Sequence, residues 1–131
     1  MISTKGRYAL RVMIDLAEHE EEGFVPLKDI AERQHISKKY LEIIMKELVN
    51  GKLVTGISGK GGGYRMTRAA GEYSVGEILE LMEGTLAPVA CLTADAAPCA
   101  GKDSCKTLPL WTEYYGMIRG FFYGKRLSEL L

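Results

Sequence analysis

The sequence lacks the features of a membrane or secreted protein. It contains no apolar run of the about 18 residues that a membrane-spanning helix needs. Lys5, Arg7 and Arg11 interrupt the N-terminal stretch in which a signal peptide would have its apolar segment. We therefore expect a cytoplasmic protein with no membrane partner.

The chain also has no net charge and no recognisable set of catalytic residues. The 17 basic side chains are matched by 17 acidic ones, so the charge of the whole chain favours neither a nucleic acid nor a membrane surface. The two histidines, His19 and His35, fit no Ser-His-Asp or Cys-His constellation, and we interpret them as solvated surface residues. The glycine-rich stretch at 59–63 lacks the Gly-Lys-Ser/Thr ending of a P-loop. We therefore do not expect an enzyme.

Cysteine is rare, and its three copies lie close together at Cys91, Cys99 and Cys105. A small cytosolic chain has little use for structural disulfides, so free thiols or metal ligands are the better interpretation. Thiolates gathered on one loop suit an iron–sulfur cluster, of the 2Fe-2S or the 4Fe-4S type. Reversible thiol oxidation, a zinc site and an inert loop remain open alternatives.

The charges that are present are unevenly distributed. Residues 28–68 carry nine basic and four acidic side chains, whereas the chain as a whole is neutral. This basic segment coincides with two expected short helices, at 26–34 and 37–50. Two helices joined by about three residues, the second with a basic first turn, are typical of a helix-turn-helix that binds DNA.

Apolar spacing predicts the other elements. A helix at 4–18 has an apolar stripe, with Arg11, Asp15 and Glu18 outside it. Residues 52–57 and 63–67 are expected to form two strands around a glycine-rich tip. Ser74 caps a helix that ends near Gly84. We expect a mainly α fold with a small β-hairpin wing: a winged helix-turn-helix DNA-binding domain at 1–84, a cysteine-containing loop at 85–106 and a C-terminal dimerisation helix at 107–131.

The last helix carries an apolar stripe of unusual size. Its members are Trp111, Tyr114, Tyr115, Ile118, Phe121 and Phe122. A protein this small cannot easily bury so many large side chains by itself, so we expect a homodimer. Packing within one chain is the alternative. Gly116, Gly120 and Gly124 recur at four-residue spacing and would permit a close helix approach.

Six motifs in order resemble a known family. They are residues 5–10 (KGRYAL), 29–37 (DIAERQHIS), 40–42 (YLE), 59–64 (GKGGGY), 75–78 (VGEI) and 110–111 (LW). Together with the cysteine loop they are similar to the Rrf2 family of bacterial winged-helix regulators, and the match covers nearly the whole chain. The resemblance implies a homodimeric transcriptional regulator, expected to be a repressor, that binds a palindromic operator in double-stranded DNA. In cluster-bearing members the cysteines hold an iron–sulfur cluster whose state changes the DNA that is bound.

The resemblance also implies roles for single residues. Ser37 and Lys39 match base-reading positions of the recognition helix, and Glu42 matches the position that tunes specificity with cluster state. Charge and periodicity add Lys38 and Lys46. The remaining expected DNA-contacting residues are Tyr40, Lys60, Lys5 and Arg7.

The cluster site departs from the family pattern at its fourth ligand. The position at which cluster-bearing relatives have a histidine is Leu108, which cannot bind metal, and Asp95, Asp103 or a small exogenous ligand could substitute. The alternative function is a winged-helix protein-interaction module with a thiol redox loop and no cluster.

Overall fold

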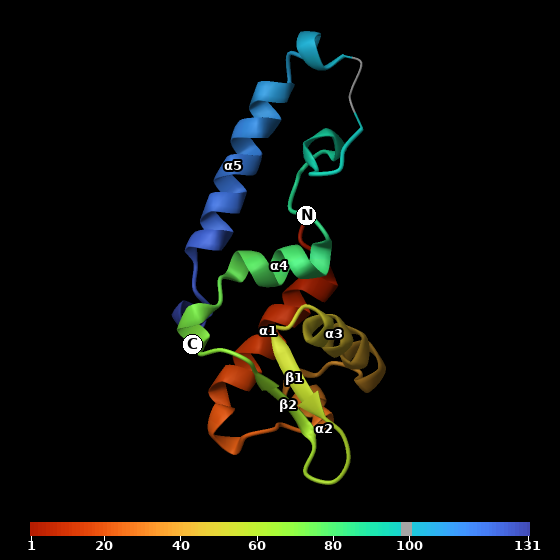
Figure 1. Cartoon of the computed structure of the whole chain (residues 1–131), viewed down its shortest axis with the longest axis vertical. Helices are drawn as coiled ribbons and strands as arrows, with labels where there is room; N and C mark the ends of the chain where they lie inside the picture. Colours follow the sequence, from red (N-terminus) through yellow and green to blue (C-terminus); the bar gives the residue numbers. More distant parts are fainter. Residues whose placement is uncertain (98–100) are drawn as a thin grey trace.

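The computed structural model describes residues 1–97 and 101–131 as a helical protein with one two-stranded sheet (Figure 1). Its elements are α1 (Thr4–Glu18), α2 (Leu27–Gln34), α3 (Lys38–Asn50), β1 (Val54–Ile57), β2 (Gly63–Met66), α4 (Val75–Glu83) and α5 (Leu108–Gly124). The antiparallel strands form the wing after α3. The predicted fold class, mainly α with a β-hairpin wing, is confirmed.

The core lies between α1, α3 and α4. The apolar stripe predicted on α1 is buried, with Ala9, Val12 and Met13 fully inaccessible. On α3 the buried residues are Leu41, Ile44, Met45 and Leu48. These positions follow the i, i+3, i+4, i+7 spacing of one helix face, so the opposite face of α3 is left free for solvent or a partner.

Asp15 corrects the prediction for α1, because it is buried rather than outside the packed face. Its side chain is 1% exposed and accepts two hydrogen bonds from Arg33 of α2, at 3.0 and 2.8 Å. Gln34 donates a third, at 2.9 Å. Arg11 in turn donates to the Gln34 side chain and backbone carbonyl. This polar cluster fixes the end of α2, and therefore the turn into α3, against α1.

The wing is attached to the body through the segment before α2. Val25 and Tyr64 exchange backbone hydrogen bonds of 2.8 and 2.9 Å, so β2 has a partner on each side. Gly63 makes this approach possible. It has a φ of +151°, and a Cβ there would lie 2.3 Å from the Val25 carbonyl oxygen. Only glycine fits at this position.

The C-terminal helix is shorter than expected. It ends at Gly124 instead of continuing to residue 131, and the chain returns to the winged body as a 3-10 turn at Leu127–Leu130. The Leu127 amide donates to the Tyr73 carbonyl at 3.0 Å, and the Leu127 side chain is fully buried. No helix among the described residues, α5 included, combines the length and apolarity needed to cross a bilayer.

Candidate nucleic-acid interface and cysteine loop

The turn between α2 and α3 has a defined geometry. His35 adopts the left-handed conformation, with φ of 54°, and its amide caps α2 by donating to the Ala31 carbonyl. Ile36 is buried and anchors the turn in the core. Ser37 is the N-cap of α3, as predicted, because its Oγ accepts from the Tyr40 amide at 3.2 Å. The first turn of α3 is thereby held in place and contains no acidic residue.

The free face of α3 carries three lysines, and the exposed Glu42 is the acidic residue beside them. Lys39, Ile43, Lys46 and Asn50 are exposed and follow one another at i, i+4, i+7 and i+11, so they form a single column along the helix. Lys38 is exposed beside this column. We call these five residues the α3 face.

A groove of about 430 Å³ separates α3 from the wing. Its lining residues are Glu42, Lys46, Val49 and Asn50 from α3, and Gly56, Ile57, Ser58 and Tyr64 from the hairpin. Beyond the groove, Lys60 lies exposed at the wing tip between Gly59 and Gly61, which have φ of +90° and +77°. Of the predicted DNA-contacting residues, Glu42 and Lys46 thus lie together in one concave surface, and Lys60, at the wing tip, is not part of its lining.

Three of the predicted residues have other contacts. The Tyr40 ring is half-buried, with its centroid 5.8 Å from that of Tyr8. The Lys5 Nζ lies 2.9 Å from Glu47 Oε1, and the exposed Arg7 donates to Thr4 Oγ1 at 3.2 Å. None of the three lines the groove. Their contact with DNA stays a prediction, and Tyr40 and Lys5 have structural roles that the motif comparison did not indicate.

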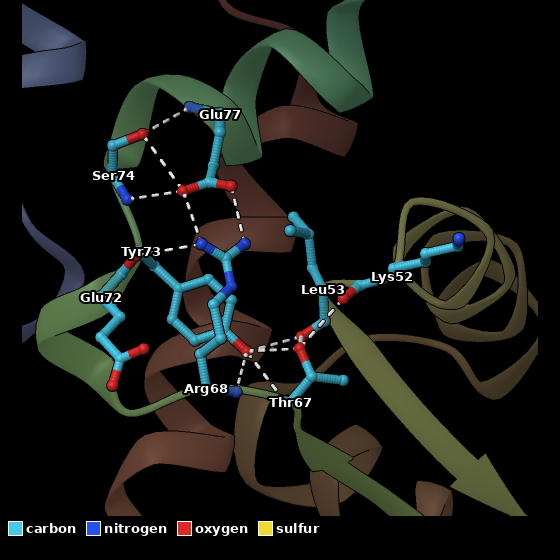
Figure 2. A network of polar contacts seen from close by, with 8 residues as sticks. All are labelled: Lys52, Leu53, Thr67, Arg68, Glu72, Tyr73, Ser74 and Glu77. Atoms are coloured by element: carbon cyan, nitrogen blue, oxygen red, sulfur yellow. Dashed lines mark hydrogen bonds and ion pairs between the residues drawn. The ribbon is translucent and has the colours of Figure 1, made fainter.

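A hydrogen-bond network fixes the base of the wing to α4 (Figure 2). The buried Tyr73 hydroxyl donates to the Leu53 carbonyl at 2.7 Å and accepts from the amides of Thr67 and Arg68. Arg68 packs over the Tyr73 ring and donates to both oxygens of Glu77, at 3.2 and 2.7 Å.

The same glutamate closes the capping box of α4 with Ser74, the N-cap predicted from sequence. Burial alone would raise the pKa of Glu77, but the hydrogen bonds from Arg68 and Ser74, together with the Arg68 charge, outweigh it and lower that pKa. The carboxylate therefore stays ionised, and the network holds the hairpin at a fixed angle to the helices.

The cysteine loop leaves the winged body after Gly84 and leads into α5. Cys91 lies in a 3-10 turn at Ala90–Leu92, and Cys105 lies two residues before Thr107, the N-cap of α5; both thiols are exposed and unpaired. A hydrogen bond with Thr107 Oγ1, together with the amides of Thr107 and Leu108, lowers the pKa of Cys105 and favours its thiolate. Cys99 lies outside the described residues.

The described part of the loop does not gather a ligand set. No three His, Cys, Asp or Glu side chains among the described residues lie close enough to hold a metal ion. Asp95 lines a pocket of about 260 Å³ together with Glu80 and Arg119, and Asp103 is exposed. The donor chemistry still suits an iron–sulfur cluster, because exposed thiols, one of them biased toward the thiolate, are its usual ligands.

Helix α5 has two apolar stripes rather than one. Trp111, Tyr115, Ile118 and Phe122 are half-buried. Tyr115 and Phe122 pack with Val75, Leu79 and Leu86 in a second small core. A neighbouring stripe is exposed and consists of Leu110, Tyr114, Met117 and Phe121, at 57%, 47%, 67% and 59%. We call these four residues the α5 stripe. Leu110 and Met117 lie outside the stripe predicted from the sequence, and Met117 is the most exposed member of the four.

The comparisons with known proteins agree with this architecture. The sequence profile of Rrf2, described as an iron-dependent transcriptional regulator, matches residues 2–131. This chain belongs to the Rrf2 family. It is 38% identical over 130 residues to the HTH-type transcriptional regulator IscR of Serratia proteamaculans, covering 99% of this chain and 78% of that protein.

Two solved structures extend the comparison. This Rrf2 protein superposes on CymR, the global cysteine regulator of B. subtilis, with a TM-score of 0.78 and 33% identity, covering 99% of this chain and 95% of CymR. It superposes on T. potens IscR with a TM-score of 0.74 and 31% identity, covering 99% and 85%. The relatives are transcriptional regulators, so this Rrf2 protein is a regulator and not an enzyme.

Proposed function

We propose that this Rrf2 protein acts as a homodimeric repressor on a palindromic operator, with a cysteine loop that senses iron–sulfur or redox status. The α3 face is the observation that carries the proposal. A helix whose N-terminus is capped, whose inner side is fully buried and whose outer side exposes three lysines has the form of a recognition helix for the major groove. The wing then lies against the adjacent backbone.

Charge around the wing supports the same interface. Lys60 is exposed at the tip, and the glycines around it allow backbone amides to approach phosphate oxygens closely. Contacts of this kind position a protein on the duplex, whereas the α3 face supplies the base contacts. Occupancy of an operator excludes other proteins from the same DNA, and this is the basis for proposing repression.

The α5 stripe supports a dimer. It forms an apolar strip on a helix about 25 Å long that lies outside the winged body (Figure 1). Gly116, Gly120 and Gly124 recur at four-residue spacing on the same helix, and a Cβ at any of them would meet open space. A second copy of the same helix would cover the apolar residues and could approach closely along the glycines.

Selection of duplexes from a random pool tests the DNA-binding proposal. We expect enrichment of a two-fold symmetric sequence with half-sites about 34 Å apart, or a multiple of that distance. Charge reversal by Lys38→Glu with Lys39→Glu should abolish enrichment, whereas Lys106→Glu, in an exposed part of the loop, should not. If no sequence were enriched, the protein-interaction alternative would be preferred.

In the proposed sensor, Cys91, Cys99 and Cys105 would hold the cluster, and the cluster would supply redox and oxygen sensitivity. The loop connects α4 to α5, so binding of a cluster by its cysteines would change how α5 is held against the winged body.

Anaerobic purification with iron and acid-labile sulfide measured per chain tests the cluster. Stoichiometric iron and sulfide, with visible absorption that is lost in a variant with all three cysteines changed to serine, are expected. A colourless protein that resists reconstitution would instead favour thiol oxidation, which mass spectrometry of the cysteines after peroxide treatment would detect.

A further inference from the structure

Ile43 is an apolar residue in the middle of the basic α3 face. Its side chain is 49% exposed and lies between Lys39, one turn earlier, and Lys46, one turn later. The lysines and Asn50 can bind phosphates or base edges, but an isoleucine cannot form a hydrogen bond with either. Any favourable contribution of Ile43 to DNA binding must come from burial against an apolar group.

The major groove offers one such group. Each base pair presents hydrogen-bond donors and acceptors there, and only thymine adds an apolar substituent, its C5 methyl. We infer that Ile43 is a specificity-determining residue that packs against a thymine methyl in each half-site, so that the operator contains thymine at the base that Ile43 faces. This inference rests on the proposed DNA-binding function and adds a base preference to it.

Other exposed apolar residues near the groove do not fit this role equally well. Ile57 is 51% exposed but belongs to the wing, which approaches the backbone or the minor groove, where thymine does not present its methyl. Val49 is 36% exposed and lines the groove between α3 and the wing. Ile43 alone of the three belongs to the column that contains Lys39 and Lys46.

Replacement of thymine by deoxyuridine provides the test, because it removes only the methyl group. The probe is the duplex selected by the wild-type protein, with each symmetry-related pair of thymines replaced in turn and affinity measured by fluorescence anisotropy. At one pair we expect a loss of about fourfold per half-site, the contribution of one buried methyl. Ile43→Ala should weaken binding to the thymine duplex by a similar factor and should make that pair insensitive to the replacement.

Ile57→Ala is the matched control, since it also shortens an exposed isoleucine beside the groove and should retain the full deoxyuridine effect. The inference is overturned if no pair responds to the replacement, or if Ile43→Ala keeps the wild-type response. Failure of the wild-type protein to bind any duplex would overturn the proposed function itself, and this outcome is distinct from either result. Because Ile43 is exposed, the alanine variant should keep the fold, which circular dichroism verifies.

Discussion

At the scale of single residues, Asp15 is the charged side chain that is buried in the described part of the chain. Its burial is tolerated because Arg33 and Gln34 satisfy its oxygens. Burial alone would raise the pKa of Asp15, but the hydrogen bonds from Arg33 and Gln34 and the Arg33 charge outweigh it and hold that pKa below its ordinary value. The periodicity of α1 could not indicate this, because the partners of Asp15 lie on another helix, 18 and 19 residues later.

Asp15→Asn should destabilise the protein in a pH-dependent way. Removing the carboxylate leaves Arg33 without its partner. We expect the free energy of unfolding to fall by about 2–3 kcal/mol at pH 7. This is at or below the lower end of the range for a buried ion pair, because the Arg33 side chain is one-third exposed. A carboxylate with a lowered pKa stabilises the fold above its unfolded pKa of about 3.9, and this stabilisation is lost as pH falls through the folded value.

Urea unfolding at pH 7 and at pH 3 measures this effect. The gap between wild type and Asp15→Asn should shrink at the lower pH. Asp29→Asn, in the same helix pair but half exposed, is the control and should show a small gap at both values. A gap of equal size at pH 3 and pH 7 would show that the loss at Asp15 is steric rather than electrostatic.

At the scale of elements, the contact of α4 with α5 depends on Gly76. A Cβ on Gly76 would lie 2.4–2.8 Å from carbon atoms of the Tyr123 ring, so the two helices could not keep their separation. Tyr123 also donates to Glu80 at 2.9 Å, and Arg119 pairs with the same carboxylate at 3.3 Å. These side chains join α5 to the winged body.

Gly76→Ala should therefore destabilise the protein by about 1–2 kcal/mol, because the overlap outweighs the gain of about 1 kcal/mol in helix propensity. Gly71→Ala, where the nearest atom to a Cβ is 3.6 Å away, is the control and should be neutral or slightly stabilising. Urea unfolding at one protein concentration compares them. Adding Tyr123→Ala should remove the extra cost at Gly76, and full additivity of the two changes would contradict the contact.

The sequence predicts an element correctly where its residues and their spacing alone determine the helix and its buried face. The stripes of α1 and α3 and the caps at Ser37 and Ser74 were predicted because periodicity and capping are local. The return of the chain after Gly124 was not predicted, since the 3-10 turn is too short for periodicity and Leu127 is held by Tyr73, distant in sequence. The sequence also predicts an aromatic stripe on α5. Which of its side chains are covered depends on the packing of α5 against α4, which spacing along α5 does not reveal.

At the scale of the whole molecule, the wing tip and the start of α5 lie at opposite ends (Figure 1). Helix α5 spans the distance between the cysteine loop and the winged body. Its N-terminal end follows the loop, and the chain after its C-terminal end is hydrogen-bonded to the winged body. Sequence alone could place Cys91 and Cys105 in a loop, but a cluster is assembled from groups that converge in space, and spacing along a chain does not determine that convergence.

Met117→Arg should prevent the proposed dimer. It places a charge in the middle of the α5 stripe, where a second helix would have to desolvate it. We expect a monomer by sedimentation velocity at micromolar concentration and a loss of about 100-fold or more in affinity for the selected duplex, because two linked half-sites no longer bind together. Glu21→Arg, which adds a positive charge in the exposed 3-10 turn after α1 and not on α5, should remain dimeric. A dimer that persists in Met117→Arg would show that the stripe is not the interface.

The central claim, that the α3 face binds duplex DNA, is tested most directly by the salt dependence of affinity. Fluorescence anisotropy of a labelled duplex across a salt series gives the slope of log affinity against log salt for wild type, the Lys38→Ala/Lys39→Ala variant and the control Lys106→Ala. Wild type and Lys106→Ala should show a steep negative slope, and the double variant a slope shallower by about 1 for each phosphate contact removed. Absence of binding to any duplex at low salt, or identical slopes for wild type and the double variant, would contradict the claim.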